Sequence, residues 1–183
     1  MKHPARTVII TGASAGVGRA IAERFAREDD RVGLIARDET ALKDVQRELQ
    51  ASGASALEWE AADVSNPAAV FAAADQLERR LGYVDIWIND AMETVFSTVA
   101  DINPAEFRRV TEVTYLSFVY GTMAALKSMR PRRRGRIIQI GSGPRWPIAA
   151  FPCRRPIAAL STQSVALRIR CARNCSTRSP ASQ

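Results

Sequence analysis

The stretch TGASAGVG (residues 11–18) decides the fold of this chain. It follows a short apolar run rich in β-branched residues, TVIIT (7–11), and it precedes apolar residues at helical spacing. A glycine-rich turn between a strand and a helix is typical of a phosphate-binding βαβ unit, because the helix N-terminus faces the phosphates. Gly12 would permit the tight turn, Gly16 would let the backbone approach a pyrophosphate, and Gly18 would let helix and strand pack closely.

Further strand-like and helix-like segments alternate after this turn. The predicted strands are short and apolar, and they cover 7–11, 31–36, 56–64, 84–89 and 135–142. Asp38 can cap the second helix, and Pro67 and Pro104 can open the third and fourth. The fourth helix would run to about Met129, with Phe107, Val110 and Val113 on its buried face. The alternation predicts an α/β fold, a Rossmann-like doubly wound parallel sheet with helices on both faces.

Several segments together resemble the short-chain dehydrogenase/reductase (SDR) family. The glycine spacing G-x-x-x-G-x-G is that family's, and AADVSN (61–66) looks like its strand-end Asp-Val. INDAM (88–92) is similar to its Asn-Asn-Ala-Gly segment, with Asp90 and Met92 as departures. IIQIGS (137–142) looks like the strand that carries its catalytic serine. The resemblance implies an oxidoreductase that moves a hydride between a nicotinamide cofactor and a carbonyl or alcohol, a small-molecule substrate.

The candidate cofactor-binding residues follow the ends of the predicted strands. They are Gly12, Ser14, Gly16, Val17, Gly18, Arg37, Asp63, Val64, Asn89 and Ala91. By resemblance, Asp63 contacts the adenine. The second strand ends in Ala36 and is followed by Arg37, where an acidic residue would favour NAD. Because a guanidinium suits a 2′-phosphate, with Ser14 as a further donor, we expect NADP, with NAD as the alternative.

The candidate catalytic residues are Ser142 and Thr114. Ser142 matches the family's serine, and Thr114 falls where the family has an asparagine. The family's tyrosine, the proton donor, and the lysine four residues after it have no counterpart here, because the last tyrosine is Tyr120 and the last lysine Lys127. The alternative function is therefore a catalytically inactive, NADP-binding fragment or pseudoenzyme.

The composition changes abruptly towards the C-terminus. Residues 130–183 contain 12 Arg and no Lys, Asp or Glu, whereas the preceding residues contain 14 basic and 19 acidic side chains. Reverse translation of the chain from Pro144 onward can be read in a shifted frame that carries Tyr-x-x-x-Lys where codons 156–161 lie. We therefore divide the chain into a partial NADP-binding domain (1–143) and an Arg/Pro-rich tail (144–183), truncated or frameshifted relative to the family and expected to be disordered. The fifth strand would then be an exposed sheet edge.

Other functional classes receive little support. His3 is the single histidine, and the three cysteines lack metal-site spacing, so we expect no metal. No signal peptide or membrane-length apolar run is present, so cytoplasm is the default and no membrane partner is expected. A cationic-tail interaction protein stays open, but Trp146 and Phe151 are too few aromatic residues for a nucleic-acid partner. The resemblance implies homo-oligomers, although the second helix of the family's dimer interface has no match in this chain.

Overall fold

The computed structural model describes residues 4–54, 56–98, 100–141 and the backbone of 169–170. The sheet contains five parallel strands, namely β1 (Thr7–Thr11), β2 (Arg31–Ala36), β3 (Leu57–Ala61), β4 (Ile86–Asn89) and β5 (Arg136–Gln139). Their order is β3-β2-β1-β4-β5, so the predicted doubly wound parallel sheet is confirmed. The strand order reverses at β1, and ligands bind such sheets at that point, beyond the carboxyl ends of the strands.

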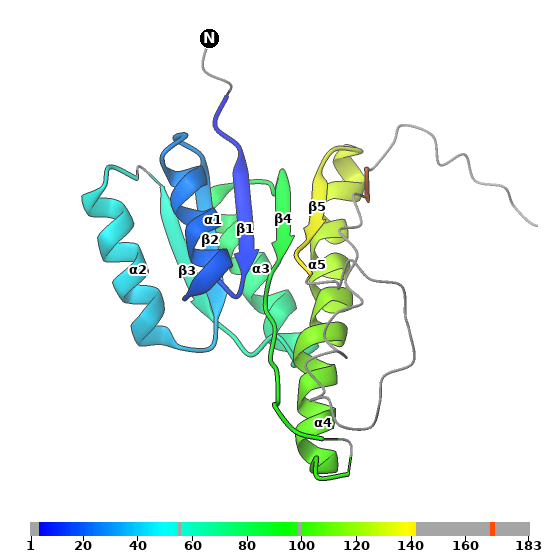
Figure 1. Cartoon of the computed structure of the whole chain (residues 1–183). Helices are drawn as coiled ribbons and strands as arrows, with labels where there is room; N and C mark the ends of the chain where they lie inside the picture. Colours follow the sequence, from blue (N-terminus) through cyan, green and yellow to red (C-terminus); the bar gives the residue numbers. More distant parts are fainter. Residues whose placement is uncertain (1–3, 55, 99, 142–168, 171–183) are drawn as a thin grey trace, which may run out of the picture.

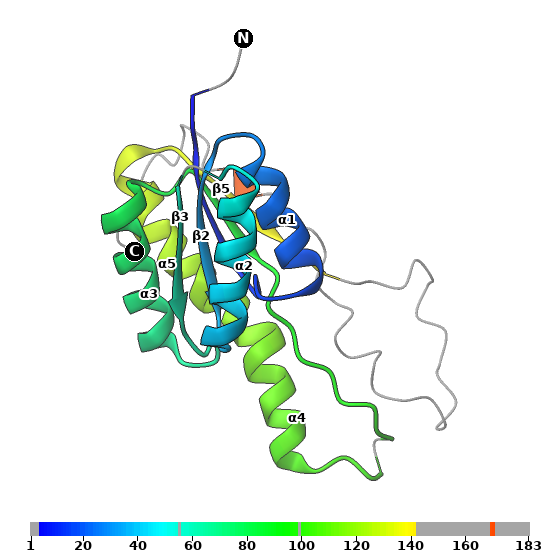
Figure 2. The same cartoon turned by 90° about the vertical axis from the view of Figure 1, so that its left-hand side faces the viewer.

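Helices cover both faces of the sheet (Figures 1 and 2). The helices α1 (Gly16–Ala26) and α2 (Glu39–Ala51) lie on one face, and α3 (Pro67–Leu81) and α5 (Ser117–Arg132) lie on the other. The predicted start signals are confirmed: the Asp38 side chain accepts a hydrogen bond from the Ala41 amide, and Pro67 stands in the first turn of α3. The short helix α4 (Pro104–Thr111) continues through the π-helical segment η1 (Glu112–Leu116) into α5.

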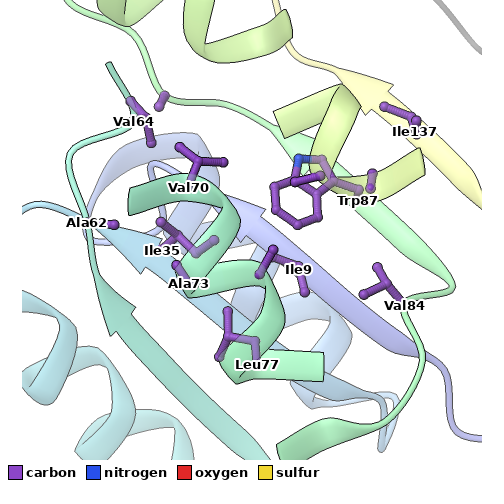
Figure 3. Packing of buried hydrophobic residues seen from close by; sticks show 14 of the residues in the cluster. Ile9, Ile35, Ala62, Val64, Val70, Ala73, Leu77, Val84, Trp87 and Ile137 are labelled. Carbon is purple, nitrogen blue, oxygen red and sulfur yellow. The ribbon is translucent and has the colours of Figure 1, made fainter. Parts of the chain in front are cut away.

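The core has two layers because the central strands bury side chains on both faces. Ile9 of β1 packs under α3 with Val70, Leu77 and Trp87 (Figure 3), whereas Val8 packs towards α1 and α2. Every residue of β1 is buried, which is why its sequence is a continuous apolar run and not an alternating one.

The fourth helix departs from the prediction at its N-terminal end. No residue of α4 is buried, and Phe107 is 43% exposed although we expected it on an inward face. The reason is position: α4 extends beyond the carboxyl edge of the sheet, where none of the described residues forms a layer beneath it (Figures 1 and 2). Val113 lies in η1, which directly follows α4, and it is buried as predicted.

The C-terminal edge of the sheet also differs from the expectation. The two-residue strand β6 (Ile169–Arg170), which was not predicted, pairs antiparallel with β5. An exposed strand edge presents unpaired amide and carbonyl groups, and pairing with an extended segment satisfies them. The strand β5 is therefore not a free edge along Arg136 and Ile137. The rest of the predicted tail, 144–168 and 171–183, lies outside the described residues.

Candidate functional site

The glycine turn after β1 brings the ends of three strands together. Gly12 has a φ of 74°, and its amide donates a hydrogen bond to the Ile35 carbonyl at the end of β2 (2.8 Å). A β-carbon on Gly12 would lie 2.8 Å from the backbone of Ala91, just after β4. The Thr11 hydroxyl accepts hydrogen bonds from the amides of Asp90 (3.2 Å) and Ala91 (3.4 Å). Only glycine fits this close approach, so the turn holds the first and fourth strand ends in contact.

The first helix begins at this turn without a side-chain cap. Ala15 is the N-cap residue and makes no side-chain hydrogen bond, and the first turn of α1 contains no acidic residue. A β-carbon on Gly18 would lie 2.5 Å from the Gly12 carbonyl oxygen, so glycine permits the close packing of helix and turn that we predicted. The partial positive charge of the helix N-terminus therefore faces the space beside the turn.

A cavity of about 370 Å³ opens at this point. It is lined by predicted site residues from the strand ends, namely Gly12, Ser14, Gly16, Val17, Arg37, Val64 and Ala91. It is also lined by residues that we did not predict, namely Ala15, Ala36, Ala62, Asp90, Met92 and Val113. Val17 of α1 is 55% exposed and lines this cavity. Three predicted residues, Gly18, Asp63 and Asn89, do not line it.

Asp63 is tied into an ionic network beside the cavity. Its carboxylate accepts hydrogen bonds from the amide (2.9 Å) and hydroxyl (2.8 Å) of Ser65 and pairs with Arg109 of α4 at 2.9 Å. Burial alone would raise the pKa of Asp63, but the hydrogen bonds from Arg109 and Ser65 outweigh it and hold that pKa below its usual value. The pKa of Arg109 is raised in turn, chiefly by its hydrogen bond to Asp63.

Glu93 joins this network to Arg37. Its carboxylate lies 3.2 Å from the Arg109 Nε and 3.5 Å from an Arg37 guanidinium nitrogen. Sequence reasoning missed both Glu93 and Arg109, because Arg109 and Asp63 are 46 positions apart and no local pattern joins them. Arg109 of α4 thus links the segments after β3 and β4, and Arg37 joins the end of β2 to them through Glu93.

Asn89 has an internal structural role in the described residues. It is fully buried, its side-chain oxygen accepts from the Trp87 indole (2.8 Å), and its amide donates to the Gln139 side chain (2.8 Å). A β-carbon on Gly121 would lie 2.1 Å from that side-chain oxygen, so the glycine lets α5 approach β4 at this level. Asn89 therefore holds β4, β5 and α5 together beneath the site.

Of the two candidate catalytic residues, the structure describes Thr114 but not Ser142. The Thr114 hydroxyl, in η1, donates to the Glu93 carbonyl (2.9 Å) and accepts from the Glu93 amide (3.0 Å). It therefore fixes the backbone after β4, and it does not line the cavity. Ser142 lies outside the described residues.

Asp90, which stands where the family has an asparagine, places an acidic side chain at the cavity. Its carboxylate lines the cavity and accepts a hydrogen bond from the Gly18 amide in the first turn of α1. Burial raises the pKa of Asp90 to about 6, although the bond from Gly18 acts in the opposite direction. An acidic side chain whose pKa lies near neutrality thus stands at the helix N-terminus.

The described residues contain neither a metal cluster nor a membrane-spanning helix. They contain no cluster of three or more His, Cys, Asp or Glu that could hold a metal ion. Across the same part of the chain, no helix is long and apolar enough to cross a membrane.

The sequence profile of the "short chain dehydrogenase" family matches residues 6–145. The chain belongs to the short-chain dehydrogenase family. Two of its curated relatives are the uncharacterized oxidoreductase YxnA of Bacillus subtilis, 33% identical over 138 residues, and dehydrogenase/reductase SDR family member 7B of Bos taurus, 34% identical over 140 residues. The matches cover 75% and 74% of this chain but only 38% and 43% of those proteins. The chain therefore spans about two fifths of the length of these relatives.

Solved structures of a ketoreductase and an alcohol dehydrogenase share this fold. A variant of actinorhodin polyketide ketoreductase, crystallised with NADPH, superposes with a TM-score of 0.73 at 28% identity, over 75% of this chain and 53% of that chain. An alcohol dehydrogenase from Thermococcus sibiricus, complexed with 5-hydroxy-NADP, gives a TM-score of 0.71 at 27% identity, over 76% and 59%.

Proposed function

We propose that this chain binds NADP(H) in the cavity at the carboxyl edge of its sheet, as part of an oxidoreductase acting on a carbonyl or alcohol. One observation carries the proposal: the cavity combines the Gly12 turn, the first turn of α1, whose N-cap residue Ala15 makes no side-chain hydrogen bond, and the Arg37 guanidinium. A phosphate-rich dinucleotide fits such a site, because backbone amides and a helix N-terminus favour anions and a guanidinium favours a further phosphate. When bound, the cofactor supplies or accepts a hydride at its nicotinamide ring.

The residues at the end of β2 favour NADP over NAD. Ala36 and Arg37 both line the cavity, and neither is the acidic residue that would accept hydrogen bonds from a ribose hydroxyl. The nearest carboxylate along the chain, Asp38, is occupied as the N-cap of α2. Ser14 also lines the cavity and offers a hydroxyl as a further donor. The NADPH and 5-hydroxy-NADP in the similar solved structures agree with this preference.

A second candidate function is cofactor binding without turnover. No tyrosine or lysine lines the cavity in the part of the chain that the structure describes. Tyr120 is packed against the core, Lys127 pairs with Asp75 of α3, and Lys43 pairs with Glu39 on α2. A proton donor for the carbonyl oxygen is therefore lacking among the described lining residues, apart from Asp90.

One experiment separates the two functions. NADPH and NADH are titrated against the protein by following the cofactor's fluorescence, and turnover is assayed with a mixture of aldehydes and ketones. Binding with turnover supports the oxidoreductase, and binding without turnover supports the second candidate. Failure to bind either cofactor overturns both.

A further inference from the structure

We propose that Glu93 sets the cofactor preference of this site by competing with the 2′-phosphate of NADP(H) for Arg37. This inference rests on the proposed function, because it concerns which dinucleotide the cavity prefers. Glu93 carries the carboxylate closest to the Arg37 guanidinium among the described ion pairs, at 3.5 Å. The residue expected to recognise the phosphate is therefore already paired with an anion.

The position of Glu93 is fixed at both its backbone and its side chain. The Thr114 hydroxyl bonds to the Glu93 carbonyl (2.9 Å) and amide (3.0 Å), and Arg109 donates from its Nε to the carboxylate (3.2 Å). Arg109 is itself held by Asp63 and Ser65, at 2.9 and 2.7 Å. Two hydrogen bonds thus hold the backbone of Glu93, and the hydrogen bond from Arg109 holds its carboxylate beside the site.

Arg37 is the more exposed member of the pair. Its side chain is 58% exposed, compared with 28% for Arg109 and 31% for Glu93. A long, exposed ion pair contributes little to stability, so Arg37 can leave Glu93 for a better partner. A phosphate offers a guanidinium two charge-assisted hydrogen bonds. On this basis, binding of NADP(H) transfers Arg37 from the Glu93 carboxylate to the 2′-phosphate.

The charges give the direction of the effect. Arg37 and Arg109 balance Asp63 and Glu93, so the network is neutral before cofactor binds. The 2′-phosphate adds negative charge next to Glu93 and must also displace it from Arg37. The ribose 2′-hydroxyl of NAD(H) is uncharged and meets neither cost. Glu93 thus lowers the preference for NADP(H) that Arg37 creates, and it is a selectivity residue, not a catalytic one.

The test compares dissociation constants of NADPH and NADH for the wild type and matched variants. Glu93→Gln keeps the shape of the side chain and removes its charge, and we expect NADPH to bind about 3 to 10 times more tightly while NADH changes less than twofold. Glu93→Ala should change the ratio in the same direction, and it replaces the Gln variant if that variant folds poorly. Glu23→Gln is the control: it makes the same change of net charge in an exposed pair with Arg27 that does not line the cavity.

A double variant tests whether the effect passes through Arg37. In an Arg37→Met background, most of the gain from Glu93→Gln should vanish, because no guanidinium remains to be released. An unchanged NADPH/NADH ratio in both Glu93 variants overturns the inference while leaving the proposed function standing, since the wild type still binds. Equal gains for NADPH and NADH also overturn it. Failure of the wild type to bind either cofactor overturns the proposed function and this inference together.

Discussion

A β-carbon on Gly12 would lie 2.8 Å from the backbone of Ala91, so the turn after β1 and the segment after β4 are in direct contact. A side chain at position 12 could be accommodated only by a shift of the Ala91 main chain, and the φ of 74° at Gly12 disfavours any other residue. This contact sets the floor of the cavity that the two segments share.

Gly12→Ala is therefore expected to destabilise the protein and to impair cofactor binding. The positive φ alone costs about 1 to 2 kcal/mol for an alanine, and the clash with Ala91 adds about 1 to 3 kcal/mol. Gly53→Ala is the matched control, because Gly53 also has a positive φ (95°) but a β-carbon there would meet nothing within 4 Å. Urea unfolding of the two variants separates backbone strain from the steric clash. Equal losses of stability in both would contradict the close contact.

Asn89→Ala is expected to reduce the free energy of unfolding by about 2 to 4 kcal/mol. The substitution removes the acceptor of the buried Trp87 indole N–H and the hydrogen bond that the Gln139 side-chain oxygen accepts. Asn66→Ala provides a comparison, since it removes an exposed N-cap of α3, where the expected cost is about 1 kcal/mol. If chemical denaturation gives the two variants the same stability, Asn89 does not support the core as described.

The stability of the wild type is expected to fall as the pH rises from about 4 to about 6 through the titration of Asp90. Its pKa is raised from 3.8 to about 6 in the folded state, so the folded protein binds the proton more tightly than the unfolded chain does. Below this pH range the carboxyl is protonated in both the folded and the unfolded state. Above it the carboxyl is ionised in both states, and its burial lowers the free energy of unfolding by a constant amount. Other groups contribute to the total pH dependence, so the comparison is with Asp90→Asn.

Asp90→Asn should remove this contribution. At pH 7.5 the variant should have a higher free energy of unfolding than the wild type. At pH 4 this advantage over the wild type should be smaller, as measured by urea unfolding at both pH values. If the difference in the free energy of unfolding between Asp90→Asn and the wild type is the same at both pH values, the pKa of Asp90 is not raised in the folded protein.

For the tail, we propose that residues from about 144 onward are encoded in a shifted reading frame. Sequencing the gene across codons 138–150 should then reveal one missing or inserted base. The restored frame should encode Tyr-x-x-x-Lys near codons 156–161 and reduce the arginine content of the tail. An uninterrupted, verified frame without a family-like reading downstream would refute the proposal.

Much of the fold follows from local patterns. The runs at 7–11 and 31–36 are strands with the predicted bounds, and Leu42, Val45 and Leu49 form the buried face of α2 as their spacing indicates. Predicted strands at 56–64, 84–89 and 135–142 are shorter in the structure, because each loop begins where the sheet pairing ends.

Local patterns are weaker guides where a residue's surroundings come from distant segments. Phe107 has the spacing of a core residue, but α4 lies beyond the edge of the sheet and leaves it exposed. No local pattern indicates that Arg109 pairs with the Asp63 carboxylate or that Asn89 bonds to Trp87 and Gln139. The contacts of Asp63 and Asn89 with a cofactor stay predictions.

The sequence by itself determined which side chains follow each strand, because in a parallel sheet the loops after the strands all open at one edge. That alone places Gly12, Arg37 and Ala91 around one cavity. Only the tertiary structure decided what the charged groups at that edge contact. Ion pairs act across space and leave no period in the chain, so the link from Arg37 through Glu93 to Arg109 exists only once three strand ends and α4 are brought together.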